Sequence, residues 1–198
     1  MEGRIEFRTA RVESGWSDFT VSLGESSWKC RASYISAHPL VDMIHTAVDL
    51  YDHIFVAPMP EESSTWDITA CDEPGGLLIR IVSIEGENRA SVFRLDDQFK
   101  PQAVPVGEGT IDYWQFADAV FSDAARTVAR YGFIGFRDRW FFPNWDRDYH
   151  YEALPIEHFL YLAALIERRK PVNEITLADE IGLLRKIQKT SRDPRTVE

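Results

Sequence analysis

The segment from Thr110 to Trp145 constrains the fold more than any other part of the chain. Apolar side chains recur in its first part at the spacing of a helix that is buried on one face. They are Phe116, Val120, Ala124 and Val128, extended by Tyr113 and Tyr131. Thr110 is a suitable N-cap and Gly132 a suitable C-terminal cap. The pattern therefore predicts a central helix over 110–131, followed by an aromatic-rich turn that ends at Trp145.

Alternating apolar and polar residues predict two groups of three strands, each joined by short turns. The first group covers residues 4–13, 19–23 and 28–34, and the second covers 66–70, 77–84 and 90–95. Residues 96–109 contain two prolines and two glycines, so we expect a polar loop there. Two antiparallel meanders follow from this order, and they can lie side by side in one sheet.

Three further helices are expected, over residues 39–51, 155–169 and 176–188. Leu177, Ile181 and Leu184 form the expected buried stripe of the last one, and Thr176 with Asp179 resembles a capping box. The predicted fold is α+β: an antiparallel sheet of about six strands, with helices packed mainly on one face. Residues 1–190 should form a single domain and residues 191–198 a loose tail.

The charge of the chain limits the partners that it can bind. The net charge is -10 over 198 residues, and residues 1–100 carry most of the excess acid. Acidic surface repels the phosphates of nucleic acids, so we expect no nucleic-acid binding. It attracts basic proteins, although the charge alone favours the simpler interpretation, a soluble acidic protein with no such partner.

Cysteine content and hydropathy point to a cytoplasmic protein. The two cysteines, Cys30 and Cys71, are far apart in the sequence and have no zinc-ligand spacing, so we expect buried reduced thiols. The N-terminus has no apolar signal core, and no run of apolar residues is long enough to span a membrane.

One stripe of the expected first helix carries histidine and aspartate. Its members are His38, Asp42, His45 and Asp49, at i, i+4, i+7 and i+11. Imidazole and carboxylate at this spacing can share a metal ion. The stripe lies opposite the apolar face of the helix, so a solvated acidic surface is the alternative interpretation.

A second candidate site combines aromatic and charged residues after the central helix. These residues are Trp140, Trp145, Asp146, Asp148, Tyr149, His150 and Tyr151. Tyrosine, tryptophan and arginine supply much of the energy in protein interfaces, which favours a binding role. A histidine beside carboxylates also suits acid–base catalysis by His150 with Asp146 or Asp148, and packing is a third interpretation. His158 is expected to be a core histidine of the following helix.

Motifs of cofactor binding and covalent catalysis are not present. The glycine pairs at 75–76 and 107–109 match neither a P-loop nor a dinucleotide-binding loop, and no GxSxG elbow occurs. We therefore expect no cofactor.

Several short motifs resemble those of small bacterial proteins that are found beside polymorphic toxins and are treated as immunity proteins. The motifs are Trp66 followed by Asp72–Gly75, Phe116-Ala117 with Val120, Tyr131-Gly132, Trp140 and Phe142-Pro143. The resemblance covers about residues 38–145, and the chain departs from the pattern in having two more helices after it. It implies stoichiometric binding without catalysis, and it identifies no binding residue.

The sequence thus supports three functional hypotheses. The first is a non-catalytic protein-binding module, an immunity protein that neutralises a basic toxin with its acidic surface. The second is an enzyme that uses His150 with Asp146 or Asp148, or a metal held by the stripe on the first helix. The third is an accessory domain of a larger assembly.

Overall fold

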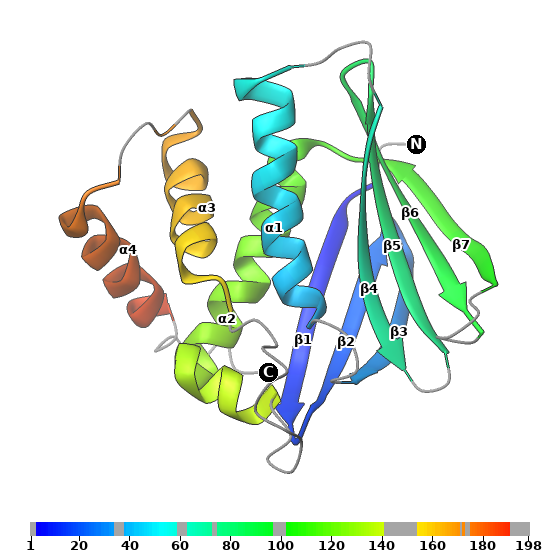
Figure 1. The fold of residues 1–198 in the computed structure, drawn as a ribbon, viewed down its shortest axis with the longest axis horizontal. Helices are drawn as coiled ribbons and strands as arrows, with labels where there is room; N and C mark the ends of the chain where they lie inside the picture. The colour runs from blue at the N-terminus through cyan, green and yellow to red at the C-terminus, as the bar shows by residue number, and fades with distance from the viewer. Residues whose placement is uncertain are drawn as a thin grey trace, which may run out of the picture.

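The computed structural model describes residues 3–33, 38–58, 63–72, 75–96, 102–140, 154–170, 172 and 175–190. Within this part of the chain it is an α+β fold (Figure 1). The strands are β1 (Ile5–Glu13), β2 (Trp16–Leu23), β3 (Ser26–Ser33), β4 (Ser64–Asp72), β5 (Gly75–Ile84), β6 (Glu87–Leu95) and β7 (Ala103–Thr110). The helices are α1 (Pro39–Tyr51), the π-helical turn η1 (Asp52–Val56), α2 (Tyr113–Trp140), α3 (Ile156–Arg168) and α4 (Leu177–Thr190).

The strands form two antiparallel sheets, not the single sheet of about six strands that the sequence predicted. One sheet has the order β1-β2-β3 and the other the order β4-β5-β6-β7. Both predicted meanders are present, and the sheets meet where β3 lies against β4. The polar link between these strands uses a side chain in place of a backbone ladder. The Asp72 carboxylate accepts from the backbone N–H of Arg31 at 3.2 Å.

Strand β7 occupies residues for which we predicted a loop. It pairs with β6 at the outer edge of its sheet, and the register shifts between Val92 and Phe93. Pro105 is tolerated because an edge strand needs donors on only one side, and bulges accommodate irregular residues. The proline and glycines that suggested a loop are therefore features of a bulged edge strand.

The helices lie together on one side of the strands, as predicted, with α4 outermost (Figure 1). The bounds of α1 agree with the prediction, and α3 differs from it by one residue at each end. Helix α2 starts later than predicted because Thr110 belongs to β7, and Asp112 caps the helix by accepting from the backbone N–H of Gln115 at 3.0 Å.

No helix among the described residues is long and apolar enough to cross a membrane.

Gly132 divides helix α2 into two segments. That residue has φ 67° and ψ 171°, which interrupts the helix, and the chain then stays helical to Trp140. Positive φ is accessible to glycine without steric cost. The first helical segment thus ends at Gly132, as predicted, and a second segment replaces the first part of the predicted aromatic turn.

The apolar stripe predicted for α4 faces the wrong way. Leu177, Ile181 and Leu184 are 70%, 40% and 37% exposed, whereas Leu183 and Ile187 are buried. The predicted capping box at the start of this helix is confirmed, since Thr176 and Asp179 exchange side-chain-to-backbone hydrogen bonds. The sequence of α4 therefore has two apolar faces, and the predicted one is exposed to solvent.

The free edge of β1 is closed by side chains of α2. The buried Asp123 carboxylate accepts from the backbone N–H of Thr9 at 2.8 Å and from its hydroxyl at 2.7 Å. Arg126 donates to the carbonyl of Phe7 at 3.0 Å and to Asp123 at 3.3 Å. Burial raises the pKa of the Asp123 carboxyl, and hydrogen bonds from Thr9 and the nearby Arg126 offset part of that effect.

The same arrangement continues along the strand. The guanidinium of Arg130 donates to the carbonyl of Ala10, and the hydroxyl of Tyr131 accepts from the backbone N–H of Val12 at 3.2 Å. Ala10 lies at an irregularity in the pairing of β1 with β2. Side chains of helix α2 therefore form hydrogen bonds with the backbone donors and acceptors of β1 that a neighbouring strand would otherwise satisfy.

Replacing Asp123 with alanine should destabilise the fold strongly. Asp123→Ala leaves the N–H and hydroxyl of Thr9 without their acceptor and removes one of the two acceptors of Arg126, so we expect the free energy of unfolding to fall by about 3 kcal/mol. Asp118→Ala is the matched control on the same helix, because its pair with Arg169 is exposed, and it should cost less than about 1 kcal/mol. Urea titrations of the two variants measure both values; similar losses would contradict this role for Asp123.

Glycine at 107 is required by contact between the two sheets. A Cβ at this position would lie 2.4 Å from the Trp28 ring of β3, too close for any real contact. We expect Gly107→Ala to lower the unfolding free energy by about 2 kcal/mol, as overpacking does. Gly182→Ala, in α4, meets nothing within 4 Å and should instead stabilise the protein by up to about 1 kcal/mol. Thermal unfolding should therefore shift in opposite directions in the two variants.

Candidate functional site

The structure places one of the predicted binding residues in the core. Trp140 is 3% exposed, and its ring packs edge-on against the ring of His38 at 4.5 Å. In place of the surface role predicted for it, Trp140 helps to enclose the start of α1. The other residues of that prediction lie outside the described part of the chain: Trp145, Asp146, Asp148, Tyr149, His150 and Tyr151.

The predicted histidine–aspartate stripe on α1 is divided by the fold. His38 is 1% exposed and not on a solvated face, because the sheets, α2 and α3 surround α1. Its Nδ1 accepts from the backbone N–H of Leu40 at 3.0 Å, so this histidine caps the helix. Burial lowers the pKa of His38 to about 3, which keeps the ring neutral and Nδ1 able to accept.

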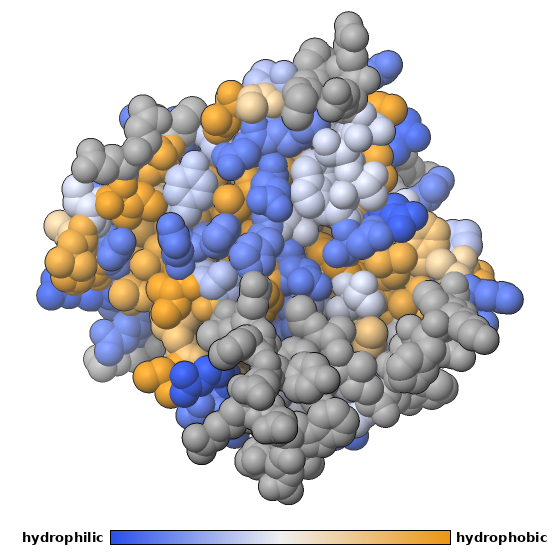
Figure 2. All heavy atoms as spheres, viewed as in Figure 1, coloured by the Kyte–Doolittle hydropathy of each residue, from blue (hydrophilic) through white to orange (hydrophobic). Residues whose placement is uncertain are grey.

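The rest of the stripe reaches the surface. Asp42 and His45 are half-buried and Asp49 is exposed, and Figure 2 shows hydrophilic surface over much of α1. His45 contacts His158 of α3, with ring centroids 4.5 Å apart, so His158 lies at a helix seam and not deep in the core. No group of three or more histidine, cysteine or acidic side chains in the described ranges could hold a metal ion.

The cysteines form no disulfide and lie where β3 meets β4. Cys71 is buried and Cys30 half-buried. The thiol of Cys30 lies 3.8 Å from the carbonyl oxygen of Ala70, and burial, followed by the charge of Asp72, raises its pKa to about 12. A thiol that stays protonated is a poor nucleophile, so Cys30 has no catalytic character.

A different surface combines exposed apolar side chains with charge. Helix α1 continues directly into the π-helical turn η1, which spans Asp52–Val56. Such turns are rare and are frequent at functional sites. Here the turn carries Phe55, which is 44% exposed, and Val56, which is 58% exposed. Figure 2 shows apolar surface at the corresponding end of α1.

Phe55 rests on rings from α1 and α2, and α3 adds one more ring to the same cluster. We call this cluster the aromatic end; its members are Tyr51, Phe55, Tyr113, Trp114 and Tyr161. Phe55 lies 5.1 Å from Tyr51, 5.5 Å from Tyr113 and 5.8 Å from Trp114, between ring centroids. Tyr51 and Tyr113 are buried, and the Tyr113 hydroxyl donates to the carbonyl of Ala47 at 3.1 Å. The exposed ring is therefore held by a fixed platform.

The charge around the aromatic end is mainly acidic. Burial raises the pKa of Asp52, and repulsion from Asp49 raises it further, while His158 opposes this shift. Arg169 stacks over Trp114 at 4.9 Å and pairs with Asp118 at 2.6 Å. Three carboxylates thus surround the cluster, and the arginine in it is already paired.

The sequence contains a signal for this site that helical and strand periodicity does not reveal. The apolar run Ile54–Val56 follows the first helix and precedes prolines, which is the context of a loop. An apolar run in a polar loop is itself unusual. Tyr113 and Trp114, which contact Phe55, are distant from it in the sequence, so no local pattern connects them.

No protein-family model, no curated protein and no solved structure matches the chain.

The buried histidine should make stability depend on pH. The pKa of His38 is about 3 in the folded state and near 6.5 when unfolded, so the unfolded chain binds the extra proton between these values. Stability is therefore full above about pH 6.5 and falls as the pH drops towards 3, by about 2 kcal/mol between pH 7 and pH 5.

His38→Asn tests this assignment, because asparagine also caps helices but does not titrate. The variant should be less stable than the parent at pH 7, where it loses packing against Trp140. Urea titrations at both pH values should show the difference between the two proteins narrowing at pH 5. A difference that stays constant would show that His38 takes up no proton on unfolding.

Proposed function

We propose that this chain is a non-catalytic protein-binding module that holds a basic protein partner at the aromatic end. The observation that carries the proposal is the exposed pair Phe55 and Val56 on the π-helical turn η1, set on buried rings and surrounded by carboxylates. Apolar anchors inside a charged rim are the usual composition of an interface hot spot.

The platform beneath Phe55 favours tight binding. Its ring is in contact with Tyr51, Tyr113 and Trp114 before any partner arrives. A side chain that is already ordered loses little conformational entropy on association, so more of the contact energy appears as affinity. Trp114 and Arg169 next to it belong to the residue types that dominate binding energies in alanine scans.

Charge supports a basic partner. The chain carries -10 overall, and Asp49, Asp52 and Asp118 lie around the aromatic end. Complementary charge accelerates encounter and selects partners more than it adds affinity. The resemblance to immunity-type proteins, which implies stoichiometric binding, supports a basic toxin as the partner that is neutralised.

The direct test uses the protein encoded by the adjacent open reading frame as the probe. We expect a one-to-one complex by size-exclusion chromatography at low salt, weakened by added salt because screening reduces charge attraction. Phe55→Ser combined with Val56→Ser should raise the dissociation constant at least about tenfold by calorimetry, as loss of hot-spot residues does.

Val104→Ser provides the matched control. Val104 is 56% exposed, as exposed as Val56, but it lies on β7 and not at the aromatic end. It should leave the affinity unchanged. Equal affinity of the double variant and the parent would remove the aromatic end from the interface, and a neighbour that is neither a toxin nor a binder would remove the immunity role.

A further inference from the structure

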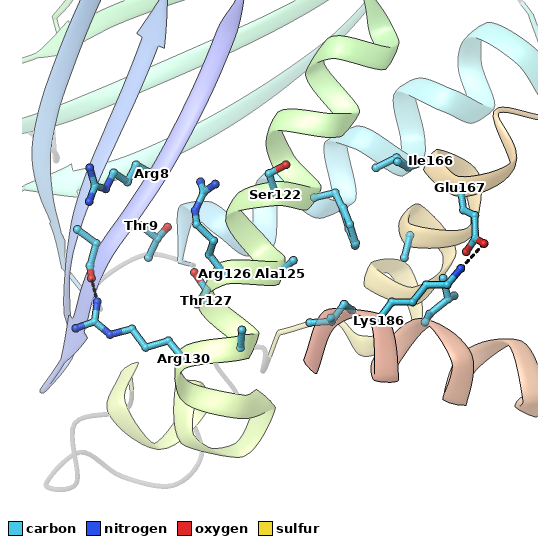
Figure 3. A pocket seen from close by; sticks show the side chains of 16 residues that line it. Arg8, Thr9, Ser122, Ala125, Arg126, Thr127, Arg130, Ile166, Glu167 and Lys186 are labelled. Atoms are coloured by element: carbon cyan, nitrogen blue, oxygen red, sulfur yellow. Dashed lines mark hydrogen bonds and ion pairs between the residues drawn. The ribbon is translucent and has the colours of Figure 1, made fainter. Parts of the chain in front are cut away.

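We propose that the groove over the outer face of α2 binds a small organic anion that has an apolar body. The groove has a volume of about 760 Å³ and receives side chains from β1, α2, α3 and α4 (Figure 3). Binding sites for small molecules usually measure about 300–1,000 Å³. No residue of the aromatic end lines it, so this site is separate from the proposed protein interface.

The floor and one wall of the groove are apolar. Helix α2 contributes two alanines and a phenylalanine, and helices α3 and α4 contribute the opposite wall. These residues are Phe121, Ala125 and Ala129 of α2, Ala163 and Ile166 of α3, and Leu183 and Ile187 of α4. The alanines leave space where longer side chains would fill the groove, so an apolar ligand body can lie against α2.

Cations gather along the same groove although the chain is strongly acidic. The four are Arg8, Arg126, Arg130 and Lys186, and the single carboxylate among the lining residues, Glu167, is paired with Lys186. The lining thus carries an excess of positive charge within a chain of net charge -10. Clefts lined by one sign of charge concentrate ligands of the opposite sign.

Two of the guanidinium groups are held in place by the edge of β1. Arg126 donates to the carbonyl of Phe7 and Arg130 to that of Ala10, as Figure 3 shows for Arg130. A guanidinium has five N–H donors in a planar fork, and these hydrogen bonds use only part of them. The remaining donors are positioned to bind a carboxylate or phosphate without further ordering.

The combined lining selects the class of ligand. A bare inorganic anion would leave the apolar floor exposed to water, and a neutral apolar molecule would offer no negative charge to the guanidinium groups of Arg126 and Arg130. An amphiphilic anion satisfies both parts, with its head near Arg126 and Arg130 and its body against Ala125 and Leu183.

Titration calorimetry with the full chain tests the proposal, with monomeric decanoate as the probe. Decanoate should bind with one-to-one stoichiometry, whereas decanol, acetate and inorganic phosphate should each bind at least about tenfold more weakly, because each lacks one half of the interaction. Equal binding of decanol or of phosphate would overturn the proposal. So would binding to phosphatidylglycerol vesicles without binding to free decanoate, since that result describes a membrane surface.

Matched variants locate the site. Arg130→Gln should weaken decanoate binding by about tenfold, the size expected for loss of a charged contact, whereas Arg185→Gln, a cation outside the groove, should not. Ala125→Phe should fill the floor and abolish binding, whereas Ala178→Phe on the exposed side of α4 should not. Unfolding transitions of all four confirm that they are folded. Binding that survives Ala125→Phe in folded protein would place the ligand elsewhere.

Discussion

Side-chain hydrogen bonds between α2 and the free edge of β1 are the interaction on which the rest of this structure depends. A helix beside a strand cannot form a backbone ladder with it, so the edge needs donors and acceptors of another kind. Asp123, Arg126 and Arg130 provide them, and the buried carboxylate of Asp123 is tolerated because Thr9 and Arg126 donate to it. These bonds fix both the position and the rotation of α2, whereas apolar packing alone would allow the helix to slide along the sheet.

Helix α2 positions residues of both candidate binding surfaces. Its first residues, Tyr113 and Trp114, form part of the platform under Phe55, while its middle turns carry Arg126 and Arg130 into the groove. The two surfaces have opposite charge. Helix α2 therefore lies between an acidic candidate surface and a basic one, on a chain whose net charge is -10.

The sequence predicted those elements whose signals are local. The bounds of α1 follow from Pro39 and an apolar face, and the start of α4 follows from its capping box. The predictions are wrong where the local sequence is compatible with two structures and tertiary contacts decide which one forms. Residues 103–110 have the composition of a loop but pair with β6, and α4 buries Leu183 and not the more regular stripe that includes Ile181. The site at Phe55 and the arginine groove were missed for the same reason, because each joins residues from three or four elements.

The way in which the sheet edges are closed has a consequence for behaviour at high protein concentration. An exposed strand edge is a template for pairing with another molecule, which leads to edge-to-edge aggregation. In the described part of the chain, helix side chains cover the outer edge of β1, and Pro105 with an adjacent bulge interrupts β7, while β3 and β4 face each other. The native fold thus offers no long regular edge to a second copy, and fibril-like association requires the chain to open first.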